Sequence, residues 1–279
     1  MTGRQAAGRP PRVVLAARGQ PFVIIACVVA LALALGGCVD RLAEHRRRAN
    51  ALLRAGDSEG ALEQCDRGLA ERQDASLLVL RSKALFELGR LPESRASYQK
   101  VIAVAAGGSP RELAQAHHGL AIIAARQQRW EAARQSFERL VRLDENDPVA
   151  RINLARICLT TADLPCAVRQ GEHARRLGGD REEVLFTLGR IYLTAGRHSD
   201  AEQSFKRICE ILPDASSCPY GVALVAAQQG DEKRAMAQLR AALARRLPDP
   251  GALSRDELLA PLKDDPSFRE LVAEARGGH

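Results

Sequence analysis

The amino-acid sequence predicts an all-α protein, an α-solenoid of about six helix-turn-helix repeats with a C-terminal helical cap. Apolar residues recur at helical spacing through most of the 279 residues. A small residue returns about every 34 positions, which is typical of repeats that stack on one another. The composition, 46% hydrophobic and only 4% aromatic, suits helices that pack through small and aliphatic side chains.

The clearest repeat covers residues 182–215. Its apolar and small residues fit two amphipathic helices separated by a turn at Gly196, and Pro213 ends the second helix. It resembles a tetratricopeptide repeat at the positions that define that family's pattern, which are Leu188, Gly189, Tyr192, Ala201, Phe205 and Pro213. The resemblance implies a right-handed superhelix in which the first helix of every repeat lines a concave groove.

The period can be followed by the small residue of each second helix, at Ala61, Ser94, Ala133, Ala167, Ala201 and Ala235. Successive members are 33, 39, 34, 34 and 34 residues apart, and the longest step contains a polar insertion around residues 107–110. We therefore expect six repeats, at about 42–74, 75–108, 114–147, 148–181, 182–215 and 216–248. Gln128 and Ala162 replace the usual turn glycine. Gly171 replaces the bulky wedge residue of the fourth repeat, which we expect to pack loosely.

Residues 249–279 change in character and are expected to form capping helices. Asp265 and Pro266 are placed as the N-cap and the first residue of a helix. Phe268, Leu271 and Val272 then form an apolar stripe. We expect this stripe to cover the exposed face of the last repeat, because the end of a solenoid needs a polar outer surface.

The N-terminus has the layout of an exported lipoprotein. Residues 1–20 contain arginine but no acidic residue, residues 21–35 are an uncharged apolar run, and two glycines and Cys38 follow. The run has 15 residues, fewer than the roughly 20 of a membrane-spanning helix. Leu35 to Cys38 resembles the bacterial lipobox. This resemblance implies a signal peptide at 1–37 and a diacylglycerol group on Cys38.

A lipid on Cys38 would anchor the mature protein to a membrane of the cell envelope. Val39 follows the cysteine and Asp40 comes one position later, a pattern that favours the outer membrane, facing the periplasm, over the inner membrane. The alternatives are an uncleaved N-terminal anchor and a plain signal peptide.

The formal charge of +7 does not indicate nucleic-acid binding. Residues 1–37 contain four arginines and no acidic residue, so the remainder has 37 basic and 34 acidic residues and a net charge of only +3. The six histidines lack metal-ligand spacing, and the sequence contains no phosphate-binding Gly-Lys loop and no nucleophile elbow. We therefore expect no enzymatic activity, metal, cofactor, nucleic acid or small-molecule substrate.

Five of the seven cysteines follow Cys38. Cys158 and Cys166 flank the turn of the fourth repeat, and Cys209 and Cys218 lie where the fifth repeat meets the sixth. Both pairs are candidate disulfides in an oxidising periplasm. The alternative, that all five thiols stay reduced, remains open. Cys65 occupies the wedge position of the first repeat and is expected to be a small buried apolar residue.

Two neighbouring rows on the first helices form the predicted groove surface. One row contains Arg46, Val79, His118, Ile152, Phe186 and Tyr220, and the other, one turn later, contains Asn50, Lys83, Ile122, Arg156, Arg190 and Leu224. The members from Val79 onward, with Phe86, are the predicted peptide-binding residues. Apolar patches beside Lys83, Arg156 and Arg190 suit a peptide with apolar anchors and acidic groups. The alternative is that Phe186 and Tyr220 pack against neighbouring helices.

These features predict a lipid-anchored scaffold of the cell envelope that binds a partner protein or peptide in its concave groove. A lipoprotein of about six tetratricopeptide repeats is similar in layout to the pilotins that assist assembly of type IV pilus secretins in the outer membrane. The alternative is an adaptor or regulator of a cell-wall enzyme or of the outer-membrane β-barrel assembly machine. The lipoprotein partner of that machine has about five such repeats.

Overall fold

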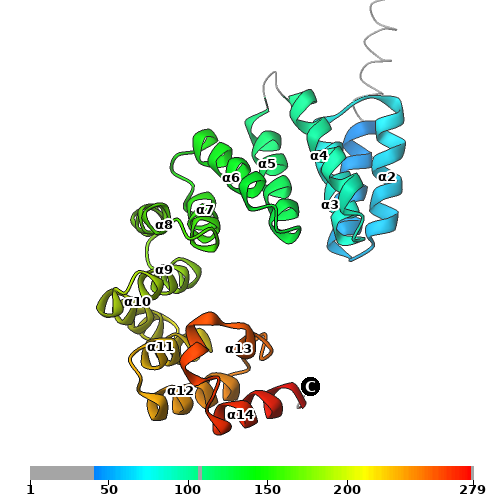
Figure 1. Cartoon of the computed structure of the whole chain (residues 1–279). Helices are drawn as coiled ribbons and strands as arrows, with labels where there is room; N and C mark the ends of the chain where they lie inside the picture. The colour runs from blue at the N-terminus through cyan, green and yellow to red at the C-terminus, as the bar shows by residue number, and fades with distance from the viewer. Residues whose placement is uncertain (1–40, 106–108, 278–279) are drawn as a thin grey trace, which may run out of the picture.

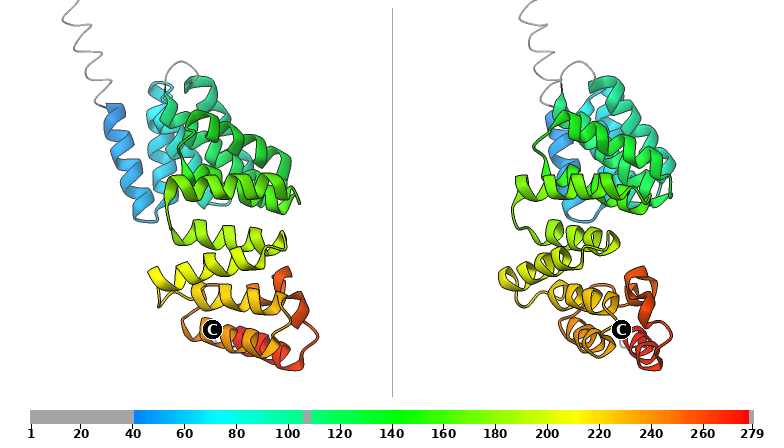
Figure 2. Two further views of the ribbon diagram at one scale, coloured as in Figure 1. Left: turned by 90° about the vertical axis from the view of Figure 1, so that its left-hand side faces the viewer. Right: turned by 60° about the vertical axis from the view of Figure 1, so that its left-hand side comes forward.

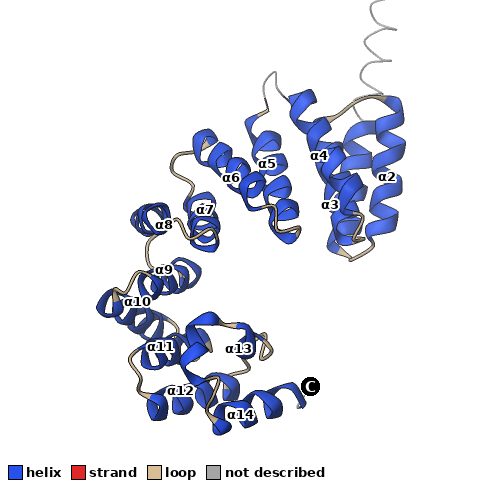
Figure 3. Ribbon diagram, viewed as in Figure 1, coloured by secondary structure: helices blue, strands red, loops and turns tan. Residues whose placement is uncertain are grey.

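The computed structural model describes residues 41–105 and 109–277, and every regular element in these ranges is a helix (Figure 3). The predicted leader, with Cys38, lies outside them. Residues 41–54 are helical and pair with the second helix. The elements that follow are α2 (Ser58–Glu71), α3 (Ala75–Glu87), α4 (Leu91–Ala105), α5 (Pro110–Arg126), α6 (Trp130–Leu143), α7 (Pro148–Thr160), α8 (Leu164–Gly178), α9 (Glu182–Thr194), α10 (His198–Ile211), α11 (Ser217–Gln228), α12 (Glu232–Ala244), α13 (Ala252–Arg255), the 3₁₀-helix η1 (Glu257–Leu262) and α14 (Pro266–Gly277).

Consecutive helices pack in pairs, and the pairs stack into a curved array (Figures 1 and 2). The first helices α7 and α9 lie on the inner side of the curve, and their partners α8 and α10 lie on the outer side (Figure 1). The elements after α12 fold back onto the last pairs. The prediction of an all-α solenoid with a C-terminal helical cap is confirmed.

The turns between paired helices adopt one backbone conformation whether or not glycine is present. Gly56 and Gly196 have φ of 80° and 72°, and Gln128 and Ala162 follow them into the left-handed region at 55° and 58°. Such a φ is unfavourable for residues with a Cβ atom. The packing of the two helices therefore imposes the turn on Gln128 and Ala162. The helices α2, α3, α7, α8 and α12 each begin directly after an aspartate whose side chain caps the helix N-terminus.

The core is built from the wedge residues of the second helices and the small residues beside them. Phe205 of α10 is fully buried, and its ring lies against Gly189 of α9 and Gly221 of α11. A Cβ atom on Gly221 would lie 2.1 Å from Phe205 Cδ1. The glycines therefore let three helices from two repeats close around one aromatic ring, as the spacing of small residues in the sequence predicts.

The fourth repeat is not loose, contrary to expectation. The space left by Gly171 is filled from the next repeat, because the δ-carbons of Leu188 and Ile191 reach within 2.9 and 3.3 Å of where its Cβ would be. The repeat also contains a disulfide between Cys158 and Cys166, whose Cα atoms are 5.8 Å apart. Neighbouring side chains thus compensate for the missing wedge.

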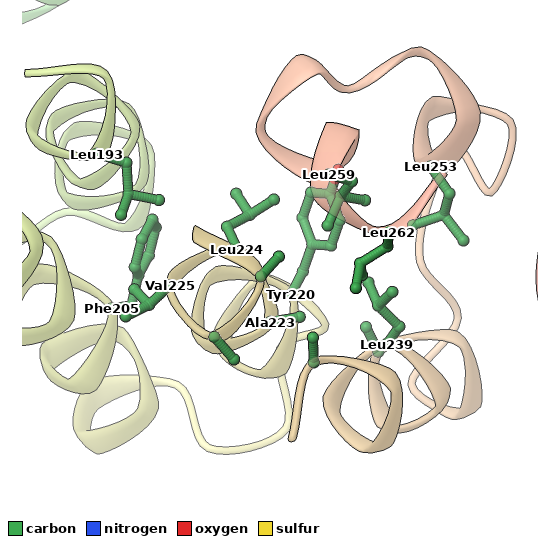
Figure 4. Close-up of a cluster of buried hydrophobic side chains, with 14 of the residues drawn as sticks. Leu193, Phe205, Tyr220, Ala223, Leu224, Val225, Leu239, Leu253, Leu259 and Leu262 are labelled. Atoms are coloured by element: carbon green, nitrogen blue, oxygen red, sulfur yellow. The ribbon is translucent and has the colours of Figure 1, made fainter. Parts of the chain in front are cut away.

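The C-terminal cap covers two surfaces rather than one. Phe268, Leu271 and Val272 of α14 are buried in the same cluster as the last pair, α11 and α12, as the sequence predicts. The preceding segment, α13 and η1, instead lies on the inner side of the curve, where η1 packs against α11 (Figure 1). Leu259 and Leu262 of this segment are completely buried, with Leu259 beside Tyr220 of α11 (Figure 4).

Candidate peptide-binding groove

The C-terminal half of the predicted groove is occupied by the chain's own cap. Asp256, at the start of η1, accepts a two-point hydrogen bond from the Arg190 guanidinium, with Nη2 and Oδ1 3.1 Å apart. Its Oδ2 also accepts a hydrogen bond from the Tyr220 hydroxyl at 2.7 Å. Gln228 of α11 donates its side-chain amide to the Leu258 carbonyl at 2.7 Å. The groove surface of the last two repeats is therefore an internal interface.

The electrostatics of this interface depend on a paired buried carboxylate. Burial alone would raise the pKa of Asp256, but the hydrogen bonds and the positive charge of Arg190 outweigh burial and hold the pKa below its usual value. Burial also raises the pKa of Tyr220, an effect strengthened by the charge of Asp256. Asp256 is thus ionised at neutral pH, and its side chain is only 6% exposed. Removing Arg190 would leave a buried charge without a partner.

Several predicted groove residues are core residues, which corrects the two-row prediction. Ile152 and Leu224 are completely buried, Val79 is 2% exposed, and Tyr220 is 7% exposed. Phe186 stacks on Tyr220 with ring centroids 5.9 Å apart and meets Phe205 edge-on at 5.5 Å. The alternative of packed aromatics therefore holds. The reason is that neighbouring first helices pack closely, so one side of each predicted row faces the next repeat instead of solvent.

The N-terminal half of the concave surface is open. It contains two adjoining hollows of about 310 and 320 Å³, which share Lys83 and Gln115 and which we call together the N-terminal groove. Its polar lining residues are Arg46, Arg47, Asn50, Ser76, Lys83, Arg111, Glu112, Gln115, His118 and Asp147. The residues come from the first helices of the first three repeats and from the start of α7.

Positive charge dominates the first of these hollows. Among the described residues, Arg47, Lys83 and Arg111 form no ion pair within 4 Å, and Arg46 meets Asp74 at 3.6 Å. The one carboxylate lining this hollow is Glu112. A hydrogen bond donated by the Ser76 hydroxyl, 2.7 Å long, holds the pKa of Glu112 below its usual value. The hollow can therefore attract an anionic group without first breaking an ion pair at Lys83 or Arg111.

The remaining predicted residues lie around this groove with different environments. His118 lines the second hollow, and burial lowers its pKa. Ile122 is half-buried, and the Phe86 ring lies 4.2 Å below the Arg126 guanidinium in a cation–π contact. Arg156 is exposed and pairs with Glu183 at 2.9 Å. These side chains remain accessible. None of them lines a hollow together with Arg190, although the predicted rows place them on one surface.

Six polar residues that line the groove are absent from the predicted rows, namely Arg47, Ser76, Arg111, Glu112, Gln115 and Asp147. Arg111 and Gln115 precede His118 by seven and three positions, so the same helical face continues toward the start of α5. Extending the rows by two turns would have found them. Arg47 follows Arg46 directly, and ordinary row spacing would not place both in one hollow.

No separate metal centre is indicated in the described part of the chain. Its one group of three closely spaced metal-binding side chains is Cys158, Asp163 and Cys166, and the two sulfur atoms are already bonded to each other. A second disulfide joins Cys209 to Cys218, with Cα atoms 4.9 Å apart, and Cys65 is a buried free thiol. Within the ranges that the structure describes, no helix is both long enough and apolar enough to cross a lipid bilayer.

Comparison with protein families supports the repeat pattern directly. Three tetratricopeptide repeat models match residues 73–146, 118–181 and 182–214, which together span just over half of the chain. The chain belongs to the tetratricopeptide repeat family. Proteins of this fold are suited to binding proteins or peptides, because their stacked first helices form an extended concave surface. A search of curated proteins finds no match.

Solved structures of other tetratricopeptide repeat proteins share this fold at low sequence identity. A tetratricopeptide repeat protein from Parabacteroides merdae superposes with a TM-score of 0.67 at 13% identity, covering 85% of this chain and 99% of its own. MamA from Desulfovibrio magneticus gives 0.54 at 19% identity, covering 61% and 94%. YrrB, described as having an unusual peptide-binding site, gives 0.50 at 18% identity, covering 67% and 90%.

Proposed function

We propose that this tetratricopeptide repeat protein is a scaffold that binds an acidic segment of a partner protein in the N-terminal groove. The observation that carries the proposal is the open hollow lined by Arg47, Lys83 and Arg111, cations without an ion pair among the described residues. Carboxylates of a partner would supply the missing negative charge. The second hollow, with Val149 and Ala150 beside His118, offers apolar contact for a neighbouring side chain.

The closed C-terminal half restricts the binding site. Because Asp256 and the leucines of η1 fill the surface of the last two repeats, the partner segment is expected to engage the first three or four repeats only. Binding at this site needs positioned charge and apolar contact but no reacting group. We therefore propose a non-enzymatic role that uses no cofactor, nucleic acid or small-molecule substrate.

The proposal can be tested by charge reversal in the groove. Lys83→Glu with Arg111→Glu is expected to reduce recovery of crosslinked partner from native envelopes at least tenfold, because two attractive contacts become repulsive. Recovery is measured by quantitative mass spectrometry after crosslinking.

The matched control is Lys233→Glu with Arg240→Glu, which makes the same change of charge at exposed positions of α12. Unchanged recovery with the groove variant, or equal loss with the control, would refute specific binding in the N-terminal groove. Helical circular dichroism of both variants verifies that the fold is retained.

We further propose that the protein is held in the cell envelope by a lipid on Cys38, facing the periplasm from the outer membrane. The lipobox-like sequence supports this location, and two disulfides are in keeping with an oxidising compartment. The measurement is incorporation of labelled palmitate, followed by membrane fractionation. Cys38→Ala is expected to abolish labelling and release the protein from the membrane. Labelling that persists in this variant would contradict the proposal.

The proposed pathway is assembly of an outer-membrane complex, for which a type IV pilus secretin is the first candidate. The basis is the layout of a lipid anchor followed by six repeats, which is similar to that of pilotins. Recovery of a secretin by the crosslinking experiment would support this assignment. Recovery of a cell-wall enzyme or a subunit of the β-barrel assembly machine would instead support an adaptor or regulator role.

A further inference from the structure

Another hollow, distinct from the two that form the N-terminal groove, lies on the opposite side of α5 and is positively charged. It has a volume of about 290 Å³, lies between α4 and α6, and has α5 as its floor. We call it the α4–α6 hollow. Gln115 and His118 of α5 face the groove, whereas His117, Leu120 and Ala124 line the hollow. Spacings of three and four residues place each set on one side of the helix, so the two sites are separate.

Arginine supplies the charge of the α4–α6 hollow. Arg95 extends from α4, and Arg129 and Arg139 from the start and the later part of α6. Among the described residues, none of the three forms an ion pair within 4 Å, and no carboxylate lines the hollow. Glu131 of α6 lies outside it and accepts a hydrogen bond from Gln135 at 3.0 Å. Three unpaired arginines around one hollow create a positive potential that attracts an anion, and Arg129 and Arg139 are exposed and thus accessible to it.

A histidine on α5 adds a further polar group to the hollow. His117 is only 7% exposed as a residue, and the described residues form no hydrogen bond with its ring nitrogens. These nitrogens are not among the fully buried atoms of the described residues, so a ligand in the hollow can reach them. Burial, together with the charges of Arg139 and Arg142, lowers the pKa of His117. Arg95 adds positive charge from α4, and no acidic side chain lines the hollow to offset it.

We infer that the α4–α6 hollow is a binding site for a phosphate group. Guanidinium groups match phosphate oxygens through paired hydrogen bonds, which both monoesters and diesters of phosphate can accept. A monoester, with a charge of about −2 at neutral pH, also offsets three arginines better than a single carboxylate does. The imidazole of His117 and the amide of Gln99 provide further polar contacts in the cavity. Ile102 and Leu120 leave an apolar wall for the organic part of the ligand. The phosphate source is either a soluble phosphate ester or a phospholipid headgroup.

The site is tested on the full chain by nuclear magnetic resonance of ¹³C-labelled histidine. The probes are inorganic phosphate, glycerol 3-phosphate and dihexanoyl phosphatidylglycerol below its micelle concentration, all at constant ionic strength. Binding is expected to shift the His117 ring signals and raise the pKa of His117, because a nearby anion favours the imidazolium form. His173, a half-buried histidine on α8 that does not line the hollow, serves as the internal reference.

Arg95→Gln with Arg139→Gln is expected to weaken binding of the probes at least tenfold, and Arg240→Gln on α12 to leave it unchanged. Tighter binding of glycerol 3-phosphate would assign the site to a soluble ester, and tighter binding of the phospholipid would assign it to a headgroup. Absence of a His117 response to every probe would overturn the inference. An equal loss of binding in Arg240→Gln would do so as well, since it would mean unspecific attraction.

Discussion

Single residues decide how closely neighbouring repeats approach. Phe205 occupies the wedge of the fifth repeat, and the absence of a Cβ at Gly189 and Gly221 leaves room for its ring. Gly171 is different, because the atoms nearest to its missing Cβ are the mobile ends of Leu188 and Ile191. Two glycines in helix interiors, Gly171 and Gly221, thus differ in how much substitution they tolerate.

Gly221→Ala is expected to lower the free energy of unfolding by about 1–3 kcal/mol, because the new methyl group would overlap Phe205. Gly171→Ala is the matched control. Its cost is offset by the higher helix propensity of alanine, a gain of about 1 kcal/mol. Urea unfolding followed by circular dichroism measures both changes. A loss of stability in Gly171→Ala as large as that in Gly221→Ala would contradict the distinction.

The ion pair between Arg190 and Asp256 gives a second prediction. Arg190→Ala is expected to cost about 3 kcal/mol, since it strands a buried carboxylate. The loss should be smaller in Arg190→Ala with Asp256→Asn, which removes the stranded charge. Equal destabilisation in the single and double variants would argue against an electrostatic role for the pair.

The same pair makes the stability of the cap depend on pH. The pKa of Asp256 is lower in the folded chain than the ordinary value of about 3.9. Its contribution to stability is therefore fully present above that value and is lost as pH falls below it. Thermal unfolding of the wild type and Asp256→Asn between pH 7 and pH 2 should show a difference that shrinks toward pH 2. A constant difference would contradict this assignment.

At the scale of elements, the disulfides act within short segments. Each links two helices over eight or nine residues, and loops of this length contribute about 2–3 kcal/mol in the entropic model. Cys65 differs from the bonded cysteines, because burial raises the pKa of its thiol to about 12. The native thiol should therefore be unreactive at neutral pH.

Alkylation followed by peptide mapping checks this prediction. Cys65 should be modified only after denaturation, and Cys158, Cys166, Cys209 and Cys218 only after denaturation with reduction. Modification of the last four in denaturant alone would mean that they are reduced thiols. The mapping separates these peptides from those containing Cys27 and Cys38.

The cap segment should stabilise the repeats it covers more than distant ones. Deleting residues 249–279 removes Leu253, Leu259 and Leu262 from the core around α11 and takes Asp256 from Arg190. Hydrogen exchange is expected to rise most in α9–α12 and least in residues 41–105, because a solenoid repeat depends mainly on its neighbours. A uniform rise along the chain would show that the solenoid unfolds as one unit instead.

For the whole molecule, the sequence predicted the architecture better than the site. The 34-residue period appears in local positions such as Ala201 and Ala235, so helices, turns and the order of repeats could be predicted. The burial of Tyr220 and Leu224 could not be predicted in this way. It results from the close packing of successive first helices and from the cap, which folds back onto α11. The Arg190–Asp256 contact, for instance, joins residues 66 positions apart. No periodic pattern encodes such a pairing.

The halves of the curve consequently have different surfaces. The N-terminal groove exposes cations such as Lys83 and Arg111, while the corresponding cation of the fifth repeat, Arg190, is neutralised within the chain. Charge available to a partner is therefore concentrated at the end nearest residue 41. This is also the end at which the proposed lipid anchor would join the solenoid.

The placement of α14 has a consequence for assembly. A stack of similar units presents at its uncovered end the kind of surface that its inner units bury against each other, so a second molecule could dock there and a third after it. Phe268 and Leu271 occupy that surface on the last pair of helices. Because α14 already covers this surface, we expect end-to-end stacking of molecules to be disfavoured at this end.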